Sequence, residues 1–213
     1  ALHEAMKRRM ATSLGALLAA LLCKELAVVT AVLIPLLPRS GSTPWRERGR
    51  WAIATIALTA AWAVAYALVR RTAHLALPHH LETDAATLSV APAARLLWAA
   101  GNSLRAIFSL PAVRRPGEMW LNGGIALLLV LAVAIPLVRR GSRVRRAGAV
   151  PWVAWGLAWF ALSSAALSTI FPIWAPNRSQ FGSVGLGVAA TVALDAAHPA
   201  LVAALVALRF VTF

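Results

Sequence analysis

Long apolar runs alternate with short basic clusters along the whole chain. The apolar runs are 11–37, 51–69, 120–138 and 150–170, followed by a shorter pair at 181–194 and 199–213. Several approach the roughly 20 residues that a helix needs to cross the hydrocarbon core of a bilayer. None has the strict alternation of an outer-membrane barrel strand. The pattern therefore predicts an all-α protein, a polytopic transmembrane helix bundle.

The first apolar run is interrupted near its middle by the charged pair Lys24 and Glu25. A charged residue at the bilayer centre costs roughly 2.5 to 3.5 kcal/mol on insertion scales. A single crossing would also place the basic residues at 7–9 and at 39–50 on opposite sides, against the positive-inside rule. We therefore expect two shorter helices with a break near Lys24, both basic clusters in the cytoplasm and the charged pair at or near the outer surface.

The remaining basic clusters agree with this orientation. We expect an external loop over 70–118, a cytoplasmic cluster at 139–146 and a short external loop at 171–180. The expected helices are 8–23, 26–38, 51–69, 119–138, 150–170, 181–194 and 199–213, within a single transmembrane domain over 1–213.

The external loop contains one more helical pattern. Apolar residues recur at helical spacing after Pro92, and they are Leu96, Leu97, Ala100, Leu104, Ile107 and Phe108. A helix of this kind lies along a membrane surface with its apolar face toward the lipid. The predicted fold is thus a transmembrane bundle with an external loop carrying a membrane-surface amphipathic helix.

Composition supports the membrane assignment and limits the partners. The chain is 60% hydrophobic and only 13% charged, below the quarter or so usual in soluble domains. The net charge of +14 comes from clusters beside apolar runs, and the aromatic residues lie within those runs. This arrangement excludes nucleic acid as the expected partner. We expect a multi-pass integral protein of a bacterial inner (cytoplasmic) membrane, in contact with membrane lipids. The chain opens on Ala1 inside a basic segment, so we expect it to be the C-terminal fragment of a longer protein.

The polar residues expected on the outer side form the candidate site. They are Lys24, Glu25, His79, His80, Glu82, Asp84, Asn102, Arg105, Asn177 and Arg178. Their cationic character suits the anionic head group of a membrane lipid. Lys24 could contact a phosphate while Glu25 positions its ammonium group; alternatively the two form a structural ion pair or a solvated helix break. Arg178 offers a planar fork that matches phosphate oxygens; alternatively it anchors a helix end among head groups.

Three further motifs have simpler interpretations. His79, His80, Glu82 and Asp84 are metal-ligand types, but adjacent histidines diverge, and a solvated loop is the favoured alternative. No cofactor is identified, and a divalent metal stays open. Trp152, Trp155 and Trp159 form a stripe that we expect to pack against helices or lipid. The glycines at 182, 185 and 187 are expected to permit close helix packing.

Two segments resemble a known family. The run 17–35, with Lys24 and Glu25 between apolar helices and Pro35 at its end, is similar to a pattern of the GT-C glycosyltransferases. The run 170–185, with Arg178 between a proline-containing helix exit and a glycine-bearing helix, resembles a later loop of the protein O-mannosyltransferase-like and tetratricopeptide-associated mannosyltransferase-like members. Where that family has an acidic residue before the arginine, this chain has Asn177.

The resemblance implies a membrane glycosyltransferase that transfers a sugar from a polyprenyl-phosphate-linked donor to an acceptor at the outer face. Lys24, Glu25 and Arg178 would then bind the donor, with Lys24 and Arg178 on its phosphate. The catalytic residue, an acid in the first external loop, would precede Ala1. The sugar and the acceptor, protein or glycan, are not specified by the sequence. Two alternatives stay open: a transporter or flippase for an anionic lipid or solute, and a non-catalytic membrane subunit.

Overall fold

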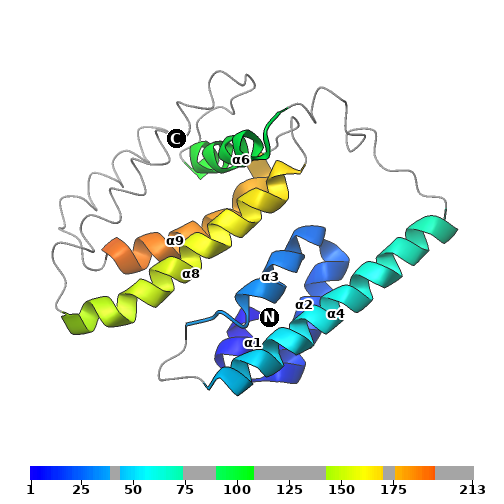
Figure 1. Cartoon of the computed structure of the whole chain (residues 1–213), viewed down its shortest axis with the longest axis horizontal. Helices are drawn as coiled ribbons and strands as arrows, with labels where there is room; N and C mark the ends of the chain where they lie inside the picture. Colours follow the sequence, from blue (N-terminus) through cyan, green and yellow to red (C-terminus); the bar gives the residue numbers. More distant parts are fainter. Residues whose placement is uncertain (39–43, 74–89, 108–142, 170–175, 195–213) are drawn as a thin grey trace. The chain divides into compact units, whose positions relative to one another are not determined.

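The computed structural model describes residues 1–38, 44–73, 90–107, 143–169 and 176–194 (Figure 1). Within these ranges every regular element is a helix, and no strand occurs. The chain divides into two compact units, Ala1–His79 and His80–Phe213. We describe each by itself; the single transmembrane domain over 1–213 stays a prediction. The helices expected at 119–138 and 199–213 lie outside the described residues.

Unit 1 is a helical hairpin that packs on a long helix. Its elements are α1 (Leu2–Met6), α2 (Met10–Cys23), the 3₁₀ turn η1 (Glu25–Ala27), α3 (Val28–Leu33) and α4 (Trp45–Thr72). The helix break expected near Lys24 is present: α2 ends at Cys23, and Lys24 has extended backbone, with φ −160° and ψ 130°. The Ala27 N–H donates to the Lys24 carbonyl at 3.0 Å, which begins the returning arm. A single extended residue therefore makes the turn without glycine or proline.

The hairpin packs on α4 through apolar side chains and one hydroxyl group. Leu17, Leu33 and Trp51 are almost completely buried. The Thr55 hydroxyl group, also buried, donates to the Ala31 carbonyl of α3 at 2.9 Å. Four residues after Ala31 stands Pro35, which has no N–H for that carbonyl. Thr55 thus satisfies an acceptor that the proline leaves open.

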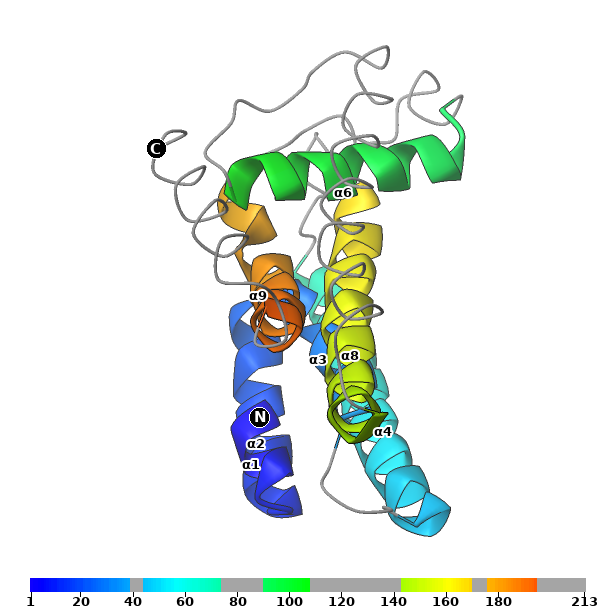
Figure 2. The same cartoon turned by 90° about the vertical axis from the view of Figure 1, so that its left-hand side faces the viewer.

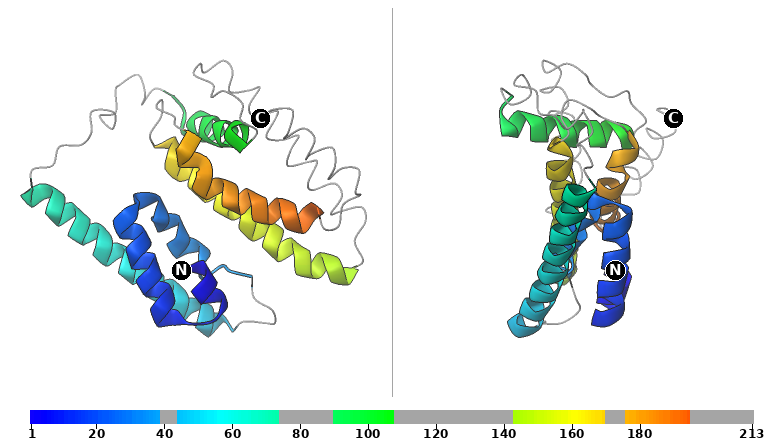
Figure 3. Two further views of the ribbon diagram at one scale, coloured as in Figure 1. Left: turned by 180° about the vertical axis from the view of Figure 1, so that it is seen from behind. Right: turned by 90° about the vertical axis from the view of Figure 1, so that its right-hand side faces the viewer.

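Unit 2 contains α6 (Pro92–Ile107), α8 (Arg143–Ser168), the 3₁₀ turn η4 (Pro176–Ser179) and α9 (Gln180–Leu194). Helices α8 and α9 lie side by side along much of their length, as Figure 3 shows from behind. A Cβ atom on Gly156 would lie 2.5 Å from the Gly185 carbonyl oxygen, and one on Gly185 would lie 2.6 Å from the Trp159 Cβ. The close packing predicted for glycines 182 and 185 is confirmed, but a Cβ on Gly187 would meet nothing within 4 Å.

The tryptophan stripe takes part in the same contact. Trp152, Trp155 and Trp159 pack edge to face in sequence, and the Trp159 ring lies 5.2 Å from that of Phe181 on α9. Trp155 and Trp159 are each only 6% exposed. The expectation that the stripe packs against a neighbouring helix is confirmed for these two rings.

Helix α6 lies across the ends of α8 and α9 (Figure 2). The helix predicted after Pro92 is confirmed; it packs on α8 through one face and leaves part of the predicted apolar face exposed. Trp98 and Ala99 are buried and cluster with Leu167 of α8, whereas Leu96 and Leu97 are 39% and 41% exposed. Among the members of the predicted apolar set whose burial the structure describes, Leu104 is buried. The packed face is wider and more polar than the periodicity indicated, since Asn102 and Ser103 are also buried on it.

Candidate functional site

Lys24 and Glu25 are presented to solvent at the tip of the hairpin. Both side chains are exposed, as is the neighbouring Cys23. Within the described part of the chain neither side chain makes a hydrogen bond or an ion pair, including with the other. The structural ion pair considered from the sequence is therefore not formed. The pair is free to contact a bound group.

The length of α2 bears on the depth of this pair. Helix α2 has 14 residues, which corresponds to about 21 Å at 1.5 Å per residue. A hydrocarbon core is about 30 Å thick. If the basic residues before α2 lie at one membrane surface, the tip of the hairpin falls short of the opposite one. An ammonium group on a long stem can reach a head group from that depth by snorkelling.

Arg178 lies in η4, where that turn contacts α6, α8 and α9. Its side chain is partly buried and has no ion pair within the described residues, while the adjacent Ser179 is 4% exposed and does have a polar or electrostatic partner. Asn177 is exposed. The turn thus holds one cation at the end of the helix pair, beside a helix whose buried face carries Asn102 and Ser103.

The predicted outer residues are brought together only in part. Asn102, Arg105, Asn177 and Arg178 belong to elements of unit 2 that contact one another. Lys24 and Glu25 belong to unit 1, so a phosphate shared by Lys24 and Arg178 stays a prediction. His79, His80, Glu82 and Asp84 lie outside the described residues. Among the residues that the structure places, no group of three histidine, cysteine or acidic side chains could hold a metal ion.

Sequence reasoning missed two polar features. The first is a pocket in unit 1, lined by arginines whose clustering the sequence explains by membrane orientation alone. The second is a set of buried polar atoms on α8: Trp159 Nε1, Ser163 Oγ and Ser164 Oγ have no hydrogen-bond partner among the residues that the structure describes. The hydroxyl groups could not have been found from sequence, because serine is as common on solvated faces.

The structure supports a coarse description of the protein: it is helical and contains candidate membrane-spanning helices. Among the described residues, two helices are long and apolar enough to cross a membrane, Trp45–Thr72 with 28 residues and Gly148–Ser168 with 21, and the fold around them is all-helical. No family model, no curated protein and no solved structure matches the chain.

Proposed function

We propose that this chain is the membrane portion of a glycosyltransferase that uses a polyprenyl-phosphate-linked sugar. Lys24 and Arg178 contact the donor phosphate, and Glu25 positions the Lys24 ammonium group. The sugar is transferred to an acceptor at the outer face of a bacterial inner membrane that the chain crosses several times. Positive charge at the phosphate would stabilise the departing lipid phosphate.

The observation that supports this proposal most is that Lys24 and Glu25, at the tip of an otherwise apolar hairpin, are exposed and have no ion pair among the described residues. An intramembrane charge without a partner is costly, and such residues generally mark a substrate or ion pathway. The partly buried Arg178 adds a second cation on a short turn, without an ion pair in the ranges that the structure describes, and its planar guanidinium group suits bidentate phosphate binding.

The first experiment measures donor binding. The chain is purified in neutral detergent and titrated with a polyprenyl phosphate and, separately, with the corresponding polyprenol, and bound lipid is counted by native mass spectrometry. We expect the phosphate to bind and Arg178→Lys or Lys24→Gln to weaken it about tenfold, the value of one charge-assisted contact. Lys7→Gln and Arg71→Gln are matched controls, because they remove an exposed cation elsewhere.

Two results would contradict the proposal. Equal binding of polyprenol and polyprenyl phosphate would show that no phosphate site exists. Full transferase activity of Arg178→Lys, measured in the complete protein with insertion verified, would remove Arg178 from the donor site. Movement of the phosphate lipid between leaflets of vesicles without sugar transfer would instead favour the transporter.

A further inference from the structure

Unit 1 contains a pocket at the end of α2 opposite Lys24. It has a volume of about 500 Å³, within the range of small-molecule sites. Its lining residues come from the turn after α1 and from the start of α4: Arg8, Met10, Pro44, Arg46, Glu47, Arg50 and Trp51. Three arginines against one carboxylate make it strongly cationic. It is independent of the donor site proposed above.

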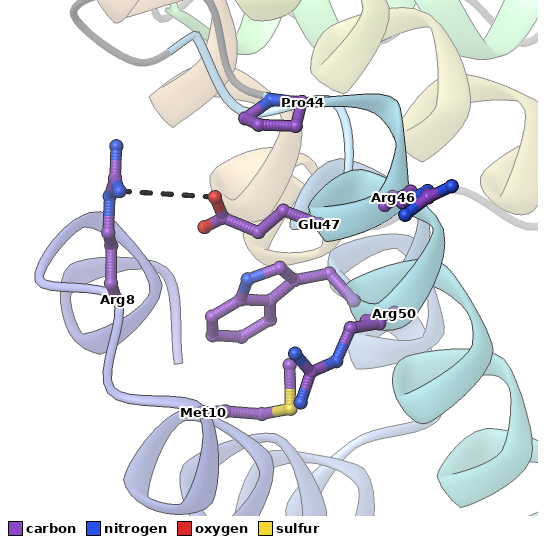
Figure 4. A pocket seen from close by; sticks show the side chains of 7 residues that line it. Arg8, Met10, Pro44, Arg46, Glu47 and Arg50 are labelled. Atoms are coloured by element: carbon purple, nitrogen blue, oxygen red, sulfur yellow. Dashed lines mark ion pairs between the residues drawn. The ribbon is translucent and has the colours of Figure 1, made fainter.

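The single acid leaves most of the positive charge available. Glu47 pairs with Arg8 at 3.9 Å, a long ion pair with both side chains partly exposed (Figure 4). Such pairs contribute little. Arg46 and Arg50 have no ion pair in the ranges that the structure describes, and the Arg50 side chain extends toward Met10 (Figure 4).

The corner between α1 and α2 fixes the position of Arg8. Its backbone has φ of 56°, a left-handed conformation that residues other than glycine rarely adopt. The corner is held by the Thr12 hydroxyl group, which donates to Glu4 at 2.8 Å, and by the Ser13 hydroxyl group, which donates to the Ala1 carbonyl at 3.0 Å. Strained backbone of this kind is frequent at ligand sites, where the surrounding contacts maintain it.

The arginines at the start of α4 lie on different sides of the helix. Arg46 and Arg50 are four residues apart and share one side of the helix, whereas Arg48 lies between them in sequence and on a different side. Arg48 does not line the pocket. The chain therefore contains a matched arginine with the same charge, on the same helix and outside the site.

The surroundings of the pocket are those of a membrane boundary. The buried Trp51 and the half-buried Met10 supply apolar lining, and the next turns of α4 expose Ile53 and Ile56 by 72% and 61%. Trp45, just before the arginines, is 87% exposed, as expected for an indole at the level of lipid head groups. A ligand here would have both a phosphate for the arginines and an apolar body beside α4.

We propose that this pocket binds the phosphodiester head group of an anionic membrane lipid, with Arg8 and Arg50 nearest the phosphate oxygens, Arg46 adding positive charge at the rim, and the acyl chains along the exposed face of α4. Basic pockets beside membrane helices recognise anionic head groups in this way. Glu47 opposes the binding, because its carboxylate competes for Arg8.

The test uses the purified chain in neutral detergent with three probes: dioctanoyl phosphatidylglycerol, dioctanoyl phosphatidylcholine and inorganic phosphate. Bound lipid is measured by native mass spectrometry, and helix content by circular dichroism. We expect phosphatidylglycerol to bind. Arg50→Gln should weaken this binding about fivefold, and the double substitution Arg46→Gln with Arg50→Gln about 25-fold. Both values follow from the contribution of one basic residue at an anionic surface. Arg48→Gln should change it less than twofold, and Glu47→Gln should tighten it.

Each alternative outcome counts against the proposal. An equal loss in Arg48→Gln and Arg50→Gln would show a diffuse basic surface instead of a pocket. Equal binding of phosphatidylcholine would remove the role of net charge. Competition by millimolar inorganic phosphate would indicate a free anion as the ligand. Weaker binding in Glu47→Gln with unchanged helix content would contradict the assigned part of that carboxylate.

Discussion

Helices α4 and α8 both contain a segment long and apolar enough to cross a membrane, yet they use their surfaces differently. In the most apolar window of each segment, 6% of α4 is buried within the protein, against 33% of α8. Helix α8 has a neighbour with glycines at the contact, which let the backbones approach closely. Helix α4 exposes Ile53, Val64 and Val69. Similar apolarity therefore serves packing in one unit and leaves a lipid-compatible surface in the other.

The largest effect is expected where α8 meets α9. Gly185→Ala should lower the free energy of unfolding by about 3 kcal/mol, because the new methyl group overlaps Trp159 and the Gly156 backbone carbonyl. Unfolding in mixed micelles, followed by circular dichroism, measures it. Gly187→Ala is the control: its Cβ would meet nothing within 4 Å, so the better helix propensity of alanine should leave stability equal or higher. Equal losses in the two variants would refute the close contact.

The next effect concerns the hydroxyl contact that joins α4 to α3. Thr55→Val should cost about 1.5 kcal/mol, because the buried Ala31 carbonyl loses its donor and Pro35 cannot replace it. Thr59→Val is the matched control, since the Thr59 hydroxyl group bonds only within α4, to the Thr55 carbonyl at 2.8 Å. The same unfolding experiment applies. A larger loss in Thr59→Val would show that the contact between helices is not the stabilising one.

A gain in stability is expected from a substitution at a buried serine of α8. Ser164 is 1% exposed and its hydroxyl group has no partner in the described part of the chain, so Ser164→Ala should raise the free energy of unfolding by about 1 kcal/mol by removing an unsatisfied buried group. Ser168→Ala provides the comparison, because that hydroxyl group bonds the Ala165 carbonyl at 2.7 Å and is exposed. A loss in Ser164→Ala would mean that its hydroxyl group is hydrogen-bonded.

The smallest effect is expected in the pH dependence of stability, through Glu4 at the corner between α1 and α2. The pKa of Glu4 is lowered from 4.5, first by the Thr12 hydroxyl group and also by the nearby cations Arg9 and Lys7. A lowered pKa in the folded state contributes stability that is present above pH 4.5 and is lost as the pH falls through the folded value. The thermal midpoint should therefore drop slightly in this acidic window, and less so in Thr12→Val. An identical pH profile for Thr12→Val would exclude this contact as the cause.

The residues of the proposed donor site come from both units, whereas the residues of the lipid pocket all belong to unit 1. Lys24 and Arg178 belong to different units, so their joint action has to be tested by binding. The pocket lies within unit 1, and Arg48 of α4 lies outside it.

Sequence alone determined the helical class, the helix break at Lys24 and the helix after Pro92, because apolar periodicity and charge placement act locally along the chain. It could not determine which face of α6 packs, since Trp98 and Asn102 are buried only because α8 and its neighbours lie there. Nor could it gather Arg8, Arg46 and Arg50 around one pocket. That arrangement depends on α1 folding back on α2 and on α2 packing against α4, and contacts between residues far apart in sequence are a property of the tertiary structure.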